Sequence, residues 1–257
     1  MLYINAISTS DTLKKDIKEL IPDAMLRRRM SNLVKISVAT AMECLQNAAI
    51  AANTVATTAA TVAPQQPPTT QPTTSTSTTT STPTPTSTIP KATPTIKPDA
   101  IITATALGFI EDGEKFLRAI FEQQEQLLNP TPFIQSTFNT VGAQIALLTN
   151  NHCYNMTYCQ REESFLHALL DAEIRISQHG ARQILAGVFD EKTPTLLALL
   201  RRLHIKEPQR EGAIFMLVSG EPQTNTIAEI DIKTLLNCSA NTSPQTACSA
   251  LNIPINL

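Results

Sequence analysis

The amino-acid sequence predicts an α/β fold in which a mainly parallel mixed sheet is covered by helices. Short continuous apolar runs, which are typical of buried strands, alternate along the chain with segments whose apolar residues recur at helical spacing. Strands that alternate with helices favour parallel pairing, and such a sheet needs helices on both of its faces. With 257 residues, the chain is long enough for one large domain of this class.

The first half of the chain is expected to hold two strands and two helices. The opening residues MLYINAIS alternate in polarity and predict a strand. Between Met25 and Leu45 the apolar side chains repeat with the spacing of one helix face. The run DAIITATALG suits a buried strand that Gly108 ends, and DGEKFLRAIFEQQEQLL predicts a helix that stops before Pro130.

The second half continues the alternation. NTVGAQIALL predicts a helix in which Gly142 allows close approach to a neighbour, and apolar residues from Phe165 to Ile176 mark a further helix face. QILAGVFD and EGAIFMLV are continuous apolar runs bounded by charge or glycine, as expected of buried strands. TIAEIDI predicts one more strand near the end of the chain.

A low-complexity segment interrupts this pattern from Thr54 to Pro98. It is rich in Thr and Pro, its charged residues are Lys91 and Lys97, and it contains no aromatic residue. Such a composition cannot bury enough apolar surface to offset the entropy of ordering, so a disordered inserted loop is expected. Residues 1–53 and 99–235 are therefore predicted to form one domain, with residues 54–98 as the insert and residues 236–257 as an irregular tail.

Composition narrows the class of function. The net charge is −2 and the sharpest basic cluster, Arg27–Arg29, reads as a solvated helix start, so no nucleic-acid surface is expected. The chain shows neither a secretion-signal layout nor a run of about 18 apolar residues, which predicts a cytoplasmic protein without a membrane span. The five cysteines are accordingly expected to be reduced.

Metal and cofactor sites are not predicted. His152, Cys153 and Cys159 lack a fourth ligand and a paired Cys-x-x-Cys, which a structural zinc site needs. The sequence has no glycine-rich phosphate loop or dinucleotide fingerprint, and seven glycines leave little to build one from. The acidic residues that could form acid/base pairs are interpreted as partners of helix dipoles; they are Glu111, Asp112, Glu162, Glu163, Asp190 and Glu191.

Cys159 is the candidate nucleophile. It stands just ahead of the helix SFLHALLDA, where the positive end of a helix would stabilise a thiolate. A working nucleophile also needs a histidine or lysine nearby in space, and the sequence does not identify one. His167, within that helix, reads as a packed histidine rather than a base.

Several segments, taken in order, resemble the N-terminal half of the β-ketoacyl synthases, most closely the divergent ketosynthase-like proteins of bacterial aryl polyene and flexirubin-type pigment pathways. The most specific are PDAIITATALG and FIQSTFNTVGAQIALL, and the others are RRRMSNLVKISVATAMECLQNA, SFLHALLDA, QILAGVFDE and REGAIFMLV. The resemblance implies a thiolase-like fold, a dimeric arrangement and work on acyl chains held by acyl carrier protein. No cofactor is implied.

The sequence departs from the enzymes of this family around the nucleophile. Counting back from Ala172 along the matching helix places the family's cysteine near Glu162, so Cys159 lies about one turn too early. Gln160, Arg161, Glu162 and Glu163 replace the small residues of the family, and their bulk is expected to crowd the turn. The histidines that the family takes from its C-terminal half are also not matched in this chain.

The resemblance and these departures predict a non-catalytic, chain-length-factor-like subunit of fatty acid or polyketide-type (aryl polyene) biosynthesis. It would pair with a related ketosynthase or with itself, with Asn139, Gly142 and Gln144 at or near the interface. The alternative is a β-ketoacyl-acyl-carrier-protein synthase or acyltransferase that uses Cys159 with histidines supplied by a partner chain. A binding module unrelated to acyl chemistry is the third possibility.

Overall fold

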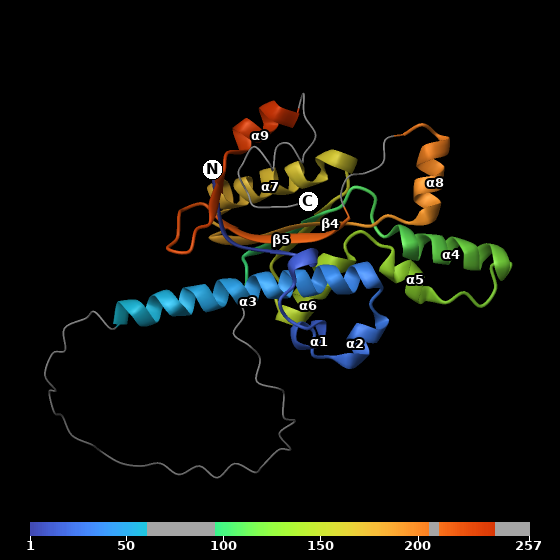
Figure 1. Cartoon of the computed structure of the whole chain (residues 1–257), viewed down its shortest axis with the longest axis horizontal. Coiled ribbons are helices and arrows are strands. Elements are labelled where there is room, and N and C mark those ends of the chain that lie inside the picture. The colour runs from blue at the N-terminus through green and yellow to red at the C-terminus, as the bar shows by residue number, and fades with distance from the viewer. Residues whose placement is uncertain (61–95, 206–210, 240–257) are drawn as a thin grey trace, which may run out of the picture.

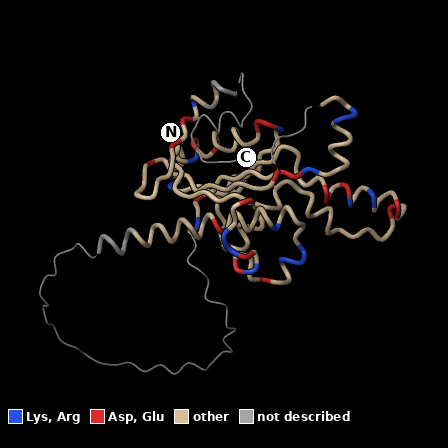
Figure 2. The backbone as a smooth tube through the Cα atoms, viewed as in Figure 1, with Lys and Arg blue, Asp and Glu red and all other residues tan. Residues whose placement is uncertain are grey.

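The computed structural model describes residues 1–60, 96–205 and 211–239. These residues form a six-stranded mixed sheet with helices on both faces (Figure 1), which confirms the predicted fold class. Within these ranges none of the helices is both long and apolar enough to cross a membrane. Basic and acidic residues are scattered over the described backbone, most of which consists of uncharged residues (Figure 2).

The strands follow the order β3-β2-β4-β5-β1-β6 across the sheet. β2 pairs in parallel with β3 and β4, whereas the β4–β5, β5–β1 and β1–β6 pairs are antiparallel. β1 to β4 therefore run in one direction, and β5 and β6 run in the other. The bounds are β1 Leu2–Thr9, β2 Ala100–Ala104, β3 Tyr154–Tyr158, β4 Gln183–Asp190, β5 Gly212–Ser219 and β6 Ala228–Ile230.

Two helix layers bury the two faces of the sheet. On one face, α7 (Ser164–His179) and α9 (Ile232–Ser239) cover a core that includes Ile102 and Ile184. On the other face, α3 (Asn32–Ala60) and α6 (Thr140–Thr149) cover a second core that includes Leu185 and Phe215. Almost all of β4 and β5 is buried because both layers cover these central strands, which explains their continuous apolar sequences.

The central strands approach each other most closely at Gly187. It lies opposite Phe215 in the β4–β5 register, and a Cβ at Gly187 would meet the Phe215 ring at 2.2 Å. The Phe215 side chain is completely buried and leaves no room for a side chain at residue 187, so glycine is required there.

The remaining helices lie outside these two layers. In Figure 1, α1 (Ile17–Leu20) and α2 (Ala24–Arg29) lie below α3, while α4 (Ile110–Glu122), α5 (Pro130–Gln135) and α8 (Pro194–Arg202) lie at the right. Two 3₁₀ turns complete the described elements, η1 (Ser10–Thr12) and η2 (Arg161–Glu163).

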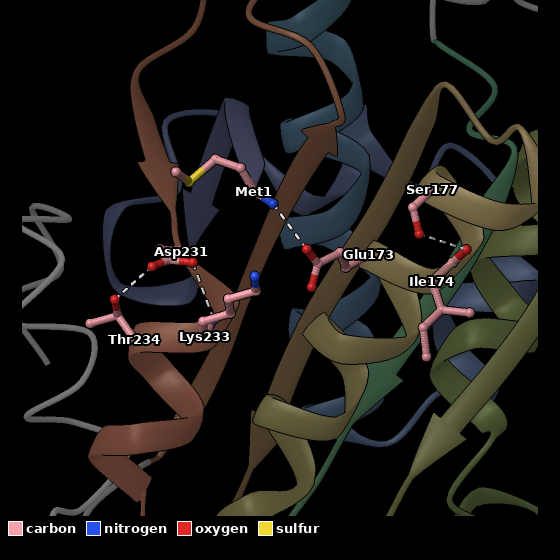
Figure 3. A network of polar contacts seen from close by, with 7 residues as sticks. All are labelled: Met1, Glu173, Ile174, Ser177, Asp231, Lys233 and Thr234. Carbon is pink, nitrogen blue, oxygen red and sulfur yellow. Dashed lines mark hydrogen bonds and ion pairs between the residues drawn. The ribbon is translucent and has the colours of Figure 1, made fainter.

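Polar contacts fix the layer formed by α7 and α9 (Figure 3). The N-terminal amine of Met1 pairs with the Glu173 carboxylate of α7 at 2.9 Å. Asp231 precedes α9 and accepts hydrogen bonds from the Lys233 backbone N–H at 3.1 Å and the Thr234 hydroxyl at 2.7 Å. The Thr234 hydrogen bond is the main cause that lowers the pKa of Asp231.

Several element boundaries differ from the prediction. The helix expected from Met25 to Leu45 is two helices, because Met30 takes an extended conformation after α2 and α3 begins at Asn32. Arg27–Arg29 consequently end a helix rather than start one, where they complement the negative end of its dipole. The helix expected to reach Pro130 ends at Glu122, since Gln124, Glu125 and Leu127 adopt positive φ angles that a helix cannot continue.

Two helices extend past the predicted boundaries of the insert and the tail. α3 continues to Ala60, into the segment 54–98, and α9 continues to Ser239, into the segment 236–257. Most of both segments lies outside the described residues. β3 was not predicted, because its sequence YNMTY is polar and only partly buried.

Candidate functional site

The candidate site lies where β2, β3 and β4 end. The carboxyl ends of neighbouring parallel strands meet at one edge of a sheet, which is where α/β folds commonly bind ligands. Here the edge comprises the loop after β2, from Thr105 to Gly108, the turn from β3 to α7, and Asp190 at the end of β4.

The turn between β3 and α7 is short and held by Ser164. The buried Ser164 hydroxyl accepts a hydrogen bond from the Gln160 backbone N–H and donates one to the Arg161 carbonyl, both at 2.7 Å. Arg161 adopts a positive φ of 55°, and η2 then leads directly into α7. The Arg161, Glu162 and Glu163 side chains are exposed. Their bulk therefore does not crowd the turn, contrary to the prediction, because the chain directs them into solvent.

Cys159 lies between β3 and this turn. Its Sγ is 4.0 Å from the carbonyl oxygen of Ala106. Cys159 is an exposed residue, but the protein atoms around its thiol displace part of its hydration and raise its pKa above the ordinary value, and the negative charge of Asp190 raises it further. Helix stabilisation of a thiolate was expected here, but the surroundings oppose ionisation. Within the described residues, no histidine or lysine is hydrogen-bonded to Cys159.

Asp190 organises the loop after β2. Its buried carboxylate oxygen Oδ1 accepts hydrogen bonds from the Thr105 hydroxyl at 2.9 Å, the Ala106 N–H at 2.7 Å and the Leu107 N–H at 3.4 Å. The Thr105 hydroxyl in turn accepts from the Gly108 N–H at 2.9 Å. The sequence predicted a helix-dipole partner at Asp190. The structure shows instead a carboxylate that connects the end of β4 to the loop after β2.

Glu191, the next residue, meets the start of α4. Its Oε1 accepts a hydrogen bond from the Glu111 backbone N–H at 2.8 Å, which confirms the predicted role at a helix start. Burial is the main cause that raises the pKa of Glu191 to about 7, and the nearby charges of Glu111 and Asp112 act in the same direction. Glu111 itself pairs with Lys115 at 2.6 Å.

Two clefts open at this edge of the sheet. The first has a volume of about 540 Å³ and lies between the loop after β2, the β3–α7 turn and α8. Its walls combine apolar residues with the charged turn; they are Ala106, Leu107, Gln160, Arg161, Glu162, Glu163, Leu200 and Ile205. The second, of about 490 Å³, lies beside Asp190 and Glu191 near the starts of α3 and α4. Glu162, which the sequence analysis predicted at the family's nucleophile position, lines the first cleft.

The possible metal ligands are not arranged for metal binding. His152 is exposed, and burial raises the pKa of the half-buried Cys153. In the part of the chain that the structure describes, no group of three or more His, Cys, Asp or Glu residues has the arrangement of a metal site.

The three predicted interface residues occupy different positions on α6. Asn139 is exposed just before the helix. Gly142 is buried, and its carbonyl oxygen accepts a hydrogen bond from Asn155 Nδ2 of β3 at 2.8 Å. Gln144 is half-buried, and its Oε1 is enclosed without a hydrogen-bond partner. The three residues therefore do not share one exposed face.

Solved structures with the same fold include ketosynthase complexes. The ishigamide ketosynthase/chain length factor matches with 14% identity and a TM-score of 0.53, over 80% of this chain and 48% of that one. The ketosynthase ApeO in complex with its chain length factor ApeC from Xenorhabdus doucetiae matches with 15% identity and a TM-score of 0.52, over 86% and 77%. AntDE:AntF, a type II polyketide synthase acyl-carrier protein in complex with its ketosynthase, matches with 13% identity and a TM-score of 0.56, over 85% and 62%.

At these identities the likeness shows the fold alone. The chain spans about half the length of the ishigamide protein that it matches. A comparison with curated protein sequences found no match. Residues 99–253, more than half of the chain, match the family of the β-ketoacyl synthase N-terminal domain. The chain therefore belongs to the β-ketoacyl synthase N-terminal domain family.

Proposed function

We propose that this protein is a non-catalytic, chain-length-factor-like subunit that pairs with a related ketosynthase in fatty acid or polyketide-type synthesis, specifically of an aryl polyene. The observation that carries the proposal is the turn from β3 to α7. Glu162, at the position matched to the family's nucleophilic cysteine, is an exposed carboxylate in a 3₁₀ turn beside the first cleft.

A carboxylate at this position cannot form the acyl-thioester that the related enzymes extend. Cys159 does not replace it, because burial and the charge of Asp190 raise the pKa of its thiol and leave little thiolate at neutral pH. Condensation also needs positioned donors for the developing oxyanion, and the loss of one such donor typically costs about 3–4 kcal/mol of transition-state stabilisation.

Pairing is supported by the relatives with the same fold. The ApeO structure holds a ketosynthase together with its chain length factor, and the AntDE:AntF structure holds a ketosynthase with its acyl-carrier protein. By analogy, this chain would bind a ketosynthase-like subunit, contribute to an acyl-carrier-protein contact, and work in the cytoplasm. The start of α6, with Asn139, Gly142 and Gln144, would lie at or near the paired surface.

Mixing with the ketosynthase encoded in the same gene cluster tests pairing. Each chain is purified separately, the two are mixed, and the masses of the single chains and of the mixture are measured by size-exclusion chromatography with light scattering. A one-to-one complex is expected. Strictly monomeric behaviour of the chain, alone and in the mixture, would contradict the proposal.

Acyl loading tests the absence of catalysis. The complex is incubated with acylated acyl carrier protein, and each intact chain is weighed by mass spectrometry. The acyl group is expected on the ketosynthase only. An acyl adduct on this chain that disappears in the Cys159→Ala variant would establish the enzymatic alternative instead. A chain that binds neither the ketosynthase nor acyl carrier protein would point to a binding module outside acyl chemistry.

A further inference from the structure

The side of α7 that faces away from the sheet carries apolar side chains. His167, Leu170 and Ile174 recur at intervals of three and four residues, so they lie along one face of the helix. Phe165 and Ala172, on the opposite face, are buried in the core between α7 and the sheet. Leu170 is half-buried and Ile174 exposes 37% of its surface. A surface helix usually presents polar residues on this side, so these three residues, the outer stripe of α7, suit a covering segment.

The charged residues of α7 already have partners inside the chain. The Glu173 carboxylate meets the N-terminal amine of Met1 at 2.9 Å, next to Ile174 in Figure 3. Asp171 accepts a hydrogen bond from Arg175 Nε at 3.4 Å. Because these ion pairs form within the chain, a segment that covers the outer stripe needs no charge of its own and gains most from apolar contacts.

His167 adds a polar requirement to the stripe. Its Nδ1 is enclosed and has no hydrogen-bond partner among the described residues. A buried polar atom without a partner costs free energy, so a covering segment should offer one. The nitrogen needs a donor or an acceptor, depending on its tautomer. An extended peptide presents both, because its backbone N–H and C=O groups are unpaired.

Residues 240–257 have the composition that this surface requires. They follow α9, which contacts α7, and they lie outside the described residues. They contain no charged residue, and from Leu251 to Leu257 every second residue is Leu or Ile. Such alternation places these side chains on one side of an extended segment. The match to the β-ketoacyl synthase N-terminal domain family continues to residue 253, so most of this stretch belongs to the domain.

The chain after α9 is long enough to reach the outer stripe. Residues 240–250 can span up to about 36 Å, whereas α7, with 16 residues, is about 24 Å long. Residues 251–257 extend over about 23 Å, which matches the length of the helix. Attachment through α9 also keeps the segment near α7 at an effective concentration of about millimolar, which favours the chain's own segment over that of a second copy.

We propose that residues 251–257 dock back onto α7 as an extended segment, with their Leu and Ile side chains against Leu170 and Ile174 and a backbone group at His167 Nδ1. The segment completes the cover on this face of the sheet, beside α9. The inference concerns this chain alone and does not depend on the proposed function.

A tryptophan placed in the segment tests docking. The chain has no Trp, so Ile255→Trp introduces a single such fluorophore and keeps an apolar side chain. Acrylamide should quench its fluorescence at least about threefold less in the folded chain than after unfolding in urea, because the docked ring is shielded from solvent.

A second substitution in the same chain shows where the tryptophan docks. Ile174→Asn removes an apolar contact from α7 and should raise the quenching constant at least about twofold. The matched control is Leu117→Asn, at an exposed apolar residue of α4, outside the layer of α7 and α9, and it should leave quenching unchanged.

Two results would overturn the inference. One is quenching as strong as in the unfolded chain, or quenching that Ile174→Asn does not change. The other is protection that appears only as the protein concentration rises, which would show that a second copy supplies the segment.

Thermal unfolding gives a test without a fluorophore. Ile174→Asn and Ile253→Asn each remove one side of the same contact, so each should lower Tm, and the double variant should have about the Tm of the less stable single variant. Leu117→Asn combined with Ile253→Asn is the control, and these two shifts should add. If Ile253→Asn leaves Tm unchanged, or if its shift adds to that of Ile174→Asn, the segment does not contact α7 and the inference fails.

Discussion

At the turn between β3 and α7, Cys159 and Glu162 stand three positions apart in different surroundings. Cys159 is exposed, but partial desolvation of its thiol and the negative charge of Asp190 raise its pKa. The Glu162 side chain is exposed beside the 540 Å³ cleft. Neither residue has the environment of a reactive thiolate, which needs a lowered pKa and a neighbouring base.

Thiol alkylation should reflect this environment. We expect Cys159 to react with iodoacetamide more slowly at pH 7–8 than glutathione does, with a rate that rises at a higher pH than that of the free thiol, because only the thiolate reacts. Peptide mass spectrometry after timed alkylation gives the pH profile of this one residue. The denatured chain is the control, and its Cys159 should follow glutathione. A native profile shifted below glutathione would restore Cys159 as a nucleophile candidate.

Glu191 should make stability depend on pH. Its pKa is raised to about 7 in the folded chain, above the ordinary value near 4.5, so the folded state holds the proton more tightly than the unfolded state does. Stability from this group is therefore complete below about pH 4.5 and is lost as pH rises through 7. Glu191→Gln keeps an acceptor for the Glu111 N–H and removes the charge. Urea unfolding should show a gain of about 1 kcal/mol at pH 8, after allowing for solvent screening, and none near pH 4.5.

Glu122→Gln removes the same charge from an exposed side chain at the end of α4 and is measured at the same two pH values as a control. A gain at pH 8 as large as that of Glu191→Gln would show that burial of Glu191 is not the cause of its effect. Equal gains for Glu191→Gln at both pH values would show that its effect is not electrostatic.

At the level of elements, α6 and β3 meet at Gly142 and Asn155. Asn155 Nδ2 donates to the Gly142 carbonyl at 2.8 Å, and a Cβ at Gly142 would lie 2.5 Å from Asn155 Oδ1. The sequence predicted that Gly142 allows close approach to a neighbour, and that neighbour is the Asn155 side chain of the edge strand β3.

A double-mutant cycle should measure this contact. In the Asn155→Ala background, Gly142→Ala should stabilise the chain by about 1 kcal/mol through helix propensity. With Asn155 present, the new methyl group displaces its amide and breaks the 2.8 Å hydrogen bond, so the gain should disappear. Urea unfolding of the four proteins then gives a coupling free energy of about 1 kcal/mol. Additive effects would mean that Asn155 moves aside at no cost.

The elements that sequence reasoning predicted well share strong local signals. β1, β4 and β5 lie within a residue or two of their predicted bounds, because their runs are apolar and bounded by charge, glycine or polar residues. β3 lacked such a signal, since YNMTY covers only the edge of the sheet. The break at Met30 was missed because apolar spacing continues across it, although the backbone changes direction there.

The candidate site, too, could be predicted only as far as local sequence signals allow. The unusual residues around Cys159 and Glu162 could be recognised from the sequence through the family pattern. Their electrostatics could not, because Asp190 reaches the site from another strand of the sheet.

At the level of the whole molecule, the sheet joins distant parts of the chain. β1 lies between β5 and β6, so the first strand is held by the last strands that the structure describes. The two strands at the opposite end, β2 and β3, come from the middle of the chain. Such pairings depend on tertiary packing, which local periodicity does not encode, and they make the order of strands the least predictable feature of the fold.

Replacement of the Thr/Pro-rich segment between α3 and β2 tests the domain prediction, because we expect the residues on either side to fold together without it. Residues 61–95 contain one charged residue and no aromatic residue, so we expect them to add little apolar burial. Replacing them with a Gly/Ser segment of about half the length should keep the circular dichroism spectrum and raise the free energy of unfolding by about 0.6 kcal/mol, since loop closure costs less. A same-length scramble of the native segment is the control and should match the wild type. Loss of cooperative unfolding, or a loss of stability in the scrambled chain, would show that the segment packs on the domain and that the domain prediction is wrong.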